Sequence, residues 1–333
     1  MRAILRSLLV VCLLGAACAG TAPPPAVAQE QPLDIRSSTL AFKIDEPGTR
    51  QVGRLIWRGG IAMTAGSRNF GGWSDLHISQ DGRTLTSISD EGAWLTATIE
   101  YDGDANLAGL VDARIGQLLG LDGKPIQNKA DADAEAMARL PDGSWLVAFE
   151  RRHRLWRYQT LAATPTPIEG PVEIGRQPAN GGIEAMAALA DGRVIAISEE
   201  HSEAPSTVMG WIGQPMPGGR YQWASFRYAT IPDFRPTALA QLPDGSFATV
   251  ERAFDPVRGV RCRVMRFPAE ALQAAGTVRA EELARLASPY AVDNLEGLAA
   301  TTGKRGETLI WLISDDNFNP LQRNMLMLFE LAP

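Results

Sequence analysis

Acidic residues recur at both ends of a hairpin motif that is repeated along this chain. Residues 135–150, 184–199 and 237–251 have nearly the same form, and looser copies begin at Asp75 and Glu296. An Asp-Gly pair separates two apolar runs in four of the five copies. This is a strong hairpin signal, because the turn needs residues that tolerate positive φ. Each copy therefore predicts two paired strands with acids at the end away from the turn.

The pairing of these strands predicts where the carboxylates gather. With Asp142-Gly143 as a two-residue turn, Glu135 lies opposite Glu150, and the same count places Glu184 opposite Glu199. Like charges directly opposite each other across two strands are destabilising. A bound cation would remove the repulsion, and calcium takes about six to eight oxygen ligands. We therefore expect a calcium site at one rim of the fold, with these ligands: Asp75, Glu135, Glu184, Glu296 and Asp315.

Other charged and polar residues near the hairpin ends could act on a bound substrate. The expected catalytic residues are Glu150, Glu199, Asp90 and Arg252. The expected substrate-binding residues are Arg68, Arg151, His201 and Asn294. An arginine can hold an anionic group such as a phosphate, but it can equally neutralise the acids beside it. A surface position without function is the alternative for any single acid, since most acids in proteins are exposed.

Several common chemistries have no counterpart in the sequence. There is no G-x-S-x-G nucleophile motif, no glycine-rich phosphate loop and no H-x-x-x-H spacing for a histidine zinc site. The aspartates of the Asp-Gly turns are explained by backbone conformation, so we do not expect them to be catalytic.

The spacing of the copies predicts the fold class. They begin at residues 75, 135, 184, 237 and 296, in steps of 60, 49, 53 and 59 residues. A period of ~40–50 residues or more, with a hairpin in each unit, is typical of an all-β propeller. Residues 39–60 and 102–130 could supply one more unit, so we expect six blades, with five or seven as alternatives. We also expect the strand at 39–44 to pair with 325–331 and close the ring.

The N-terminus has the pattern of an export signal. Arg2 and Arg6 precede an uncharged apolar run at 8–17, and Ala26-Val-Ala28 is a small-residue cleavage motif. We expect residues 1–28 to be a signal peptide, 29–38 a linker and 39–333 one propeller domain in a periplasmic or secreted protein. A lipid anchor at Cys18 is the less favoured alternative, because the large aliphatic residue expected three positions earlier is absent.

The charge of the chain bears on its partners. The formal charge of −6 becomes −8 once the two arginines of the signal are removed. An acidic protein is poorly suited to sequence-independent binding of nucleic acid. The chain after the signal also lacks a run of ~20 apolar residues that could span a membrane.

Several segments resemble the phytase-like propeller family described as having esterase-like activity of phytase. The matching segments are Asn69-Phe-Gly-Gly-Trp-Ser-Asp-Leu, Ser89-Asp-Glu-Gly, Glu135-Ala-Met, Asn180-Gly-Gly-Ile-Glu-Ala-Met, Arg235-Pro-Thr-Ala-Leu-Ala and Val292-Asp-Asn-Leu-Glu-Gly-Leu. The resemblance implies a six-bladed propeller, export, and a calcium-linked hydrolase of an ester or phosphoester. It transfers no catalytic residue, so the site residues above come from the hairpin pattern.

Three functions are compatible with these residues. The leading interpretation is an exported, calcium-dependent hydrolase of a small-molecule ester or phosphoester. The second is a non-catalytic propeller that binds a ligand or a protein at the same rim. The third is a sugar-lactone hydrolase in which acids from different blades hold one divalent ion.

Overall fold

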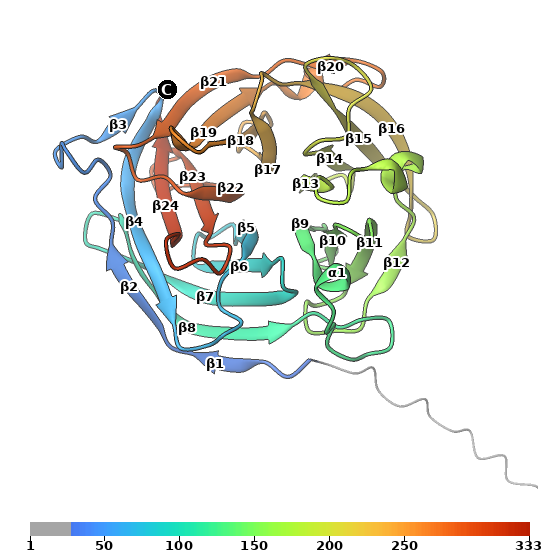
Figure 1. Cartoon of the computed structure of the whole chain (residues 1–333), viewed down its shortest axis with the longest axis horizontal. Helices are drawn as coiled ribbons and strands as arrows, with labels where there is room; N and C mark the ends of the chain where they lie inside the picture. The colour runs from blue at the N-terminus through green and yellow to red at the C-terminus, as the bar shows by residue number, and fades with distance from the viewer. Residues whose placement is uncertain (1–27) are drawn as a thin grey trace, which may run out of the picture.

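The computed structural model describes residues 28–333, and in this range the chain forms a β-propeller of five blades around a central axis (Figure 1). Almost all of the expected signal peptide, with Cys18, lies outside the described residues. The innermost strands of the five blades are β5, β9, β13, β17 and β22, and they surround the centre of the disc. No helix among the described residues has the length and apolar character needed to cross a membrane.

The elements follow the hairpin pattern. Blade one contains β5 (Trp73–Ile78), β6 (Thr84–Ser89), β7 (Ala93–Tyr101), β8 (Leu107–Gln117) and β1 (Gln31–Leu33). Blade two contains β9 (Ala134–Arg139), β10 (Trp145–Phe149), β11 (Arg154–Tyr158) and β12 (Thr166–Ile168). Blade three contains β13 (Ile183–Ala188), β14 (Val194–Ser198), β15 (Thr207–Met216), β16 (Arg220–Ala229) and β20 (Thr277–Val278).

The last two blades complete the ring. Blade four contains β17 (Arg235–Gln241), β18 (Phe247–Asp255), β19 (Gly259–Phe267) and β21 (Glu281–Ala287). Blade five contains β22 (Asn294–Thr302), β23 (Thr308–Asp315), β24 (Asn324–Leu331), β4 (Leu55–Ala65) and β2 (Ile35–Thr39), with β3 (Gln51–Val52) beside β4. The helical turns are α1 (Lys129–Ala132), η1 (Val172–Arg176) and η2 (Ala269–Ala271).

The predicted propeller is confirmed, but the expected six blades are wrong. The two segments that we expected to form a sixth blade add outer strands to existing blades instead. Residues 39–60 supply the start of β4 in blade five, and 102–130 supply β8 in blade one. Neither segment forms a sheet of its own: the short β3 pairs with β4, and β8 pairs with β7 and β1. The expected linker 29–38 also holds β1 and most of β2, which pair with β8 and β4.

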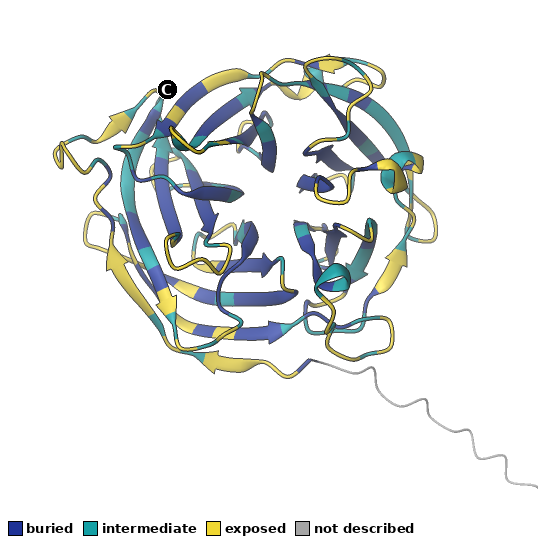
Figure 2. Ribbon diagram, viewed as in Figure 1, coloured by how far each residue is buried: buried dark blue, intermediate teal, exposed yellow. Residues whose placement is uncertain are grey.

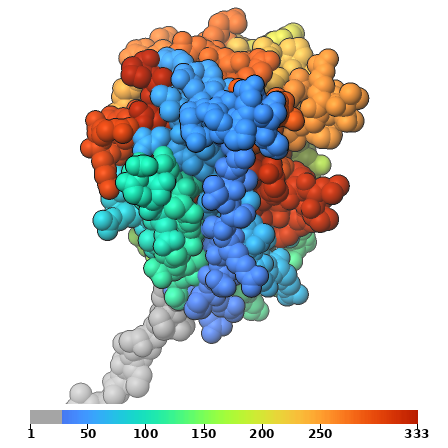
Figure 3. All heavy atoms as spheres, turned by 90° about the vertical axis from the view of Figure 1, so that its left-hand side faces the viewer, coloured from blue at the N-terminus to red at the C-terminus, as the bar shows by residue number. Residues whose placement is uncertain are grey.

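The ring is closed by N- and C-terminal strands in one sheet, as expected, but the predicted pairing was wrong. Strand β24 pairs with β4, and β2 covers the outer edge of β4. Residues 40–44 lie outside these strands, where Lys43 bridges to Tyr290. Figure 3 shows these N-terminal segments in blue beside C-terminal segments in red. Closure of the sheet removes an exposed strand edge.

The predicted register of the hairpins was wrong by one residue. Trp145 pairs with Arg139 and Ala148 with Ala136, so Glu135 does not face Glu150 directly. The turn is longer than two residues: Leu140 N donates to Ser144 O, and Gly143 N donates to Leu140 O. Only Gly143 of the Asp-Gly pair has positive φ, at 84°. The Asp142 carboxylate instead accepts the backbone N–H of Ser144.

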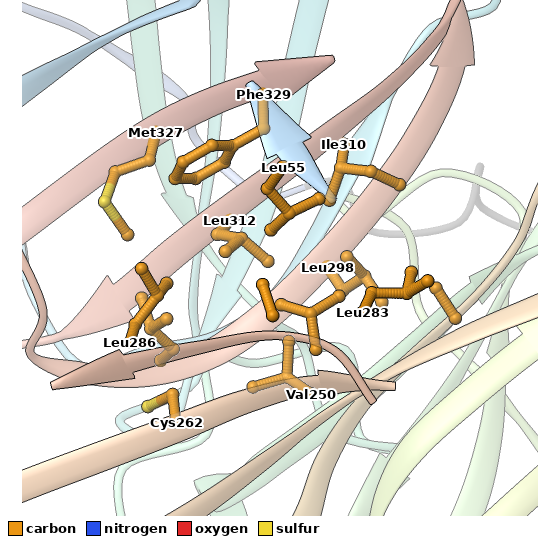
Figure 4. Close-up of a cluster of buried hydrophobic side chains, with 14 of the residues drawn as sticks. Leu55, Val250, Cys262, Leu283, Leu286, Leu298, Ile310, Leu312, Met327 and Phe329 are labelled. Atoms are coloured by element: carbon orange, nitrogen blue, oxygen red, sulfur yellow. The ribbon is translucent and has the colours of Figure 1, made fainter. Parts of the chain in front are cut away.

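The core consists of five apolar clusters, each between two neighbouring blades. Figure 2 shows the buried inner strands and the exposed loops and outer edges. Figure 4 shows the cluster between blades four and five, where Val250 and Leu286 face Leu312 and Phe329. Burial of these side chains fixes each blade against the next, and so fixes the ends of the innermost strands around the axis.

Candidate active site

Each innermost strand begins with a β-bulge, and the bulges define the site. One residue in each blade has no partner on the second strand, and these residues are Ser74, Glu135, Glu184, Thr237 and Glu296. A bulge re-aims the side chain of the extra residue. Three of the five bulge residues are glutamates, and they lie at the same end of the propeller, away from the Asp-Gly turns.

Blade two supplies the first group of carboxylates. Oxygen atoms of Asp133, Glu135 and Glu150 all lie within 4.8 Å of one another. Asp133 is 1% exposed and accepts from Lys129 Nζ at 2.6 Å and from Arg151 Nε. Glu150 Oε1 accepts from Gly182 N of blade three at 3.0 Å. The group therefore links two blades and has the oxygen donors that a hard cation prefers.

Arg252 joins the carboxylates of blades three and five. Its Nη2 lies 3.3 Å from Glu199 Oε1, and its Nε lies 3.2 Å from Glu296 Oε1. Glu184, beside Glu199, is 9% exposed, and its Oε2 is buried without a hydrogen-bond partner. A buried carboxylate oxygen without a partner is costly, so this atom is suited to a ligand.

Blades five and one complete the circle. Asp315 Oδ2 accepts from Asn294 Nδ2 at 3.3 Å, and its Oδ1 accepts from Asn317 N at 2.6 Å. Asp90 Oδ2 accepts from Lys129 Nζ at 2.6 Å, whereas its Oδ1 is buried without a partner. We call the following residues the carboxylate ring: Asp90, Asp133, Glu135, Glu150, Glu184, Glu199, Glu296, Asp315 and Asp316.

The electrostatics of the carboxylate ring favour protonation. Burial, together with the charges of Asp133, Glu150 and Asp90, raises the pKa of Glu135 well above its usual value. Burial also raises the pKa of Glu150 to about 7, that of Asp315 to about 7 and that of Glu296 to about 8. Without a ligand, several of these groups therefore hold protons near neutral pH.

The basic groups at the ring keep their positive charge. Burial acts to lower the pKa of Arg252, but the charges of Glu296, Glu184 and Glu199 outweigh it and raise the pKa. The pKa of Lys129 is also raised, because Asp90 and Asp133 outweigh its burial. Lys129, Arg151 and Arg252 face nine carboxyl groups, so these three cations do not neutralise a fully ionised ring.

The structure brings most of the predicted site residues together. Glu135, Glu184, Glu296, Asp315, Glu150, Glu199, Asp90 and Asn294 belong to the ring or contact it, as do Arg151 and Arg252. Arg252 holds the place in blade four that Glu150 and Glu199 hold in their blades, and Glu251 lies one residue earlier, where its side chain is buried. There it pairs with Arg263 and accepts from Tyr228 Oη at 2.9 Å.

Asp75 lies apart from the ring because it is one residue past the bulge. Ser74 holds the place that Glu135 holds in blade two. The Asp75 carboxylate accepts from Leu76 N and from Met137 N of blade two, both at 2.7 Å. Both oxygens are therefore engaged, one within β5 and one with blade two, which leaves Asp75 poorly suited to the metal-ligand role that we expected.

Two predicted substrate-binding residues also lie apart from these carboxylates. Arg68 is exposed on the loop before β5. The His201 ring stacks on Trp211 within blade three, at 6.4 Å between ring centroids, and its Nε2 is buried without a hydrogen-bond partner. The geometry assigns neither side chain a contact with the ring, and their roles stay predictions.

Lys129 and Asp133 are two residues of the site that the hairpin pattern did not predict. Both lie at the short helix α1, where Asn128 Oδ1 caps the first turn by accepting from Ala130 N. The i,i+4 spacing of Lys129 and Asp133 is a signal that could have identified the pair. Their position at the ring depends on how α1 packs over blade two, which the hairpin pattern does not encode.

A cavity on the central axis lies away from the carboxylate ring. It has a volume of about 1360 Å³ and is lined by the Asp-Gly turns and by the ends of the innermost strands next to them. The lining includes Met137, Met186, Leu239 and Pro141. No ring carboxylate lines it. The ring and the cavity therefore occupy opposite ends of the central axis.

Solved structures with a distant likeness to this chain cover most of its length. No curated protein matches the chain. A solved structure of a protein of unknown function from Dyadobacter fermentans is 14% identical, covers 92% of this chain and 95% of its own, and has a TM-score of 0.42. A luciferin-regenerating enzyme is 12% identical, covers 89% and 96%, and has a TM-score of 0.38. We base no argument on these likenesses.

The family match covers the whole carboxylate ring. The profile of the phytase-like family, described as esterase-like activity of phytase, matches residues 68–318. This range begins before Gly71-Gly72 and ends just after Asp316, so it includes all five bulges. The chain belongs to the phytase-like family, esterase-like activity of phytase.

Proposed function

We propose that this protein hydrolyses an ester or phosphoester and that its carboxylate ring holds a divalent cation, with calcium as the first candidate. The observation that carries the proposal is the ring itself: nine carboxyl groups from neighbouring blades converge on one end of the axis with three cations among them. Glu184 Oε2 and Asp90 Oδ1 are buried there without partners.

The residues at the ring fit a hard cation. Every candidate donor is a carboxylate or amide oxygen, which suits calcium or magnesium better than zinc. Glu135, Glu184, Glu296 and Asp315 are the residues that we propose as ligands. A bound cation would supply positive charge that polarises an ester or phosphoryl oxygen.

The side chains of this chain would perform the proton transfers. Glu150 would accept a proton from water and return it to a leaving group; in the absence of an ion, burial raises its pKa to about 7. Glu199 and Asp90 flank the same space. Arg252 and Arg151 provide the positive charge that an anionic substrate needs, and Arg252 is oriented by two carboxylates.

The test is a hydrolase panel on the purified protein, with calcium and with a chelator. The panel contains a p-nitrophenyl carboxylic ester, a p-nitrophenyl phosphate ester and a sugar lactone. We expect calcium-dependent hydrolysis of an ester or phosphoester that is lost in Glu150→Gln. Calcium binding without any hydrolysis would support a non-catalytic binding propeller, and turnover of the lactone alone would support the lactonase alternative.

We also propose that the protein is exported to the periplasm or secreted. The support is the N-terminal pattern of Arg2, Arg6, the apolar run and the Ala26-Val-Ala28 motif. Sequencing the N-terminus of the protein from its native host tests this. A start at residue 29 supports soluble export, a start at a lipid-modified Cys18 supports the anchored alternative, and retention of Met1 contradicts both.

A further inference from the structure

The loop between β23 and β24 holds an aromatic side chain beside the ring in an unusual backbone conformation. Asn317 and Phe318 have φ angles of 48° and 49°. Bulky residues rarely adopt this left-handed region. Outliers of this kind cluster at functional sites, where the surrounding structure maintains them.

Ring carboxylates maintain this conformation. Asp315 Oδ1 accepts from Asn317 N at 2.6 Å, and Asp316 Oδ1 accepts from Phe318 N at 3.2 Å. Asp316 Oδ1 also accepts from Gly72 N of blade one at 3.1 Å. The position of Phe318 is therefore tied to the same acids that form the proposed cation site.

The absence of side chains at Gly71 and Gly72 leaves room for the phenyl ring of Phe318 next to the carboxylates of Asp90 and Asp316. A Cβ atom on Gly71 would lie 3.1 Å from Phe318 Cε1 and 2.6 Å from Asp316 Oδ1. A Cβ atom on Gly72 would lie 2.7 Å from Phe318 Cε2 and would collide with Asp90 Oδ1, the buried oxygen without a partner. Phe318 thus lies directly beside the carboxylate of Asp90.

The loop that carries Phe318 exposes two apolar side chains although it borders a charged site. Phe318 is 41% exposed, and Leu321 on the same loop is 90% exposed. Other exposed apolar side chains also lie at the ring end of the propeller: Val172, Ile231, Phe254 and Val257. At the opposite end, the β15–β16 hairpin exposes Met216. Single exposed apolar residues are normal in proteins, so what distinguishes Phe318 is its position against Asp90 and Asp316.

We infer that Phe318 and Leu321 form a subsite for the apolar part of an amphiphilic ester whose polar group lies at the carboxylate ring. This inference rests on the proposed function and names its substrate class: an ester or phosphoester with an aromatic or alkyl group of four carbons or more. The carboxylate ring and its cation bind the polar group, and the phenyl face and Leu321 cover the chain.

Binding of non-hydrolysable alkylphosphonates tests the subsite separately from catalysis. The dissociation constants of methyl-, butyl- and octylphosphonate are measured by calorimetry with saturating calcium. We expect octylphosphonate to bind at least tenfold more tightly than butylphosphonate, below the ~200-fold that four fully buried methylenes would give. Phe318→Gly, in which glycine suits the positive φ, and Leu321→Ser should each reduce this ratio at least threefold and leave methylphosphonate binding unchanged.

Met216→Ser at the opposite end is the matched control and should keep the wild-type ratio. The inference is overturned if the wild type shows no dependence on chain length, if no phosphonate binds, or if Met216→Ser lowers the ratio as much as Phe318→Gly does. If chain-length-dependent binding requires Phe318 but no ester is hydrolysed, the subsite stands and the proposed hydrolysis fails. If esters are hydrolysed at rates independent of chain length in the wild type and in both variants, the hydrolase stands and the subsite fails.

Discussion

The two ends of the same hairpins carry acids in opposite electrostatic states. At the turn end, the hydroxyl of Ser144 and the backbone of Ser144 lower the pKa of Asp142, and Arg157 adds to this effect. Ser246 likewise lowers the pKa of Asp244, with Arg266 Nη2 at 2.5 Å from its Oδ2. At the ring end, burial raises the pKa of Glu135, Glu150 and Glu296.

The difference shows how one repeat can serve two purposes. Each turn aspartate is exposed and has its own hydroxyl or arginine partner on the same hairpin, so it is satisfied locally. The ring carboxylates are brought together from different blades and are buried against one another. Their charge can be balanced only by protons, by the few cations nearby, or by a bound ion. The ring end is therefore the one that should respond to pH and to metal.

The largest expected effect is on the pH dependence of stability in a chelator. Glu150, Asp315 and Glu296 have folded-state pKa values of about 7, 7 and 8, above the ~4 of the unfolded chain. The folded state thus holds protons that the unfolded state has released, so stability is highest below about pH 4 for these groups and is lost as pH rises through 7 to 8. Each proton changes the free energy of unfolding by up to ~1.4 kcal/mol per pH unit.

Urea unfolding at pH 5, 6, 7 and 8 measures this effect. Saturating calcium should flatten the profile, because the ion replaces the protons. A profile in chelator that is flat, or that rises with pH, would show that these groups are not protonated in the folded state and would remove the contrast between the two ends.

The second effect is stabilisation by calcium. A ligand that binds only the folded state at a hundredfold excess over its Kd stabilises by ~2.7 kcal/mol. Replacing Glu135 and Glu184 together with Gln should abolish the shift in Tm with calcium and any hydrolase activity. It should also raise the stability of the metal-free protein, because folding no longer has to bury or protonate these two carboxyl groups. The matched control, Asp142→Asn with Asp191→Asn at the turn end, should keep the calcium response. An equal loss of response in both double variants would contradict a site at the ring.

The third effect concerns Gly72, where the absence of a side chain leaves room for Phe318 and Asp90. Gly72→Ala introduces a Cβ that meets Phe318 and Asp90 at a φ of 65°, and we expect a loss of about 1–3 kcal/mol. Gly245→Ala at the turn end has a φ of 86° and no atom within 4 Å of the new Cβ. It should lose about 1 kcal/mol or less and leave calcium binding unchanged. Thermal unfolding with and without calcium compares the two, and equal losses would mean that crowding at Gly72 has no energetic consequence.

The smallest effect should come from a single turn aspartate. Asp244→Asn removes an exposed ion pair with Arg266, which contributes roughly 0–1 kcal/mol. Since the pKa of Asp244 is lowered, its contribution is present above about pH 4 and is lost as pH falls further. Chemical unfolding at pH 7 and pH 3 measures the difference, which should be near zero at pH 3. A loss of more than ~2 kcal/mol at pH 7 would show that the turn end is not satisfied locally.

The sequence by itself determined the hairpins, the propeller class and the end at which the acids gather. These depend on local features: the Asp-Gly turns, the apolar runs on either side, and the place of Glu135, Glu184 and Glu296 before them. Such features recur along the chain, so an error of one residue in the register of Glu135 and Glu150 did not change the end on which they lie.

The tertiary structure decided the blade count and the composition of the ring. Strands β4 and β8 join blades on the basis of packing that no local pattern records, and this reduced the expected six blades to five. The bulge places Ser74 and not Asp75 at the ring position of blade one, and the register of blade four places Arg252 and not Glu251 there. Arg252 and Lys129 reach carboxylates of neighbouring elements. The physical reason is that turns and strands are set by residues close in sequence, whereas burial and charge pairing depend on residues that only the closed ring brings together.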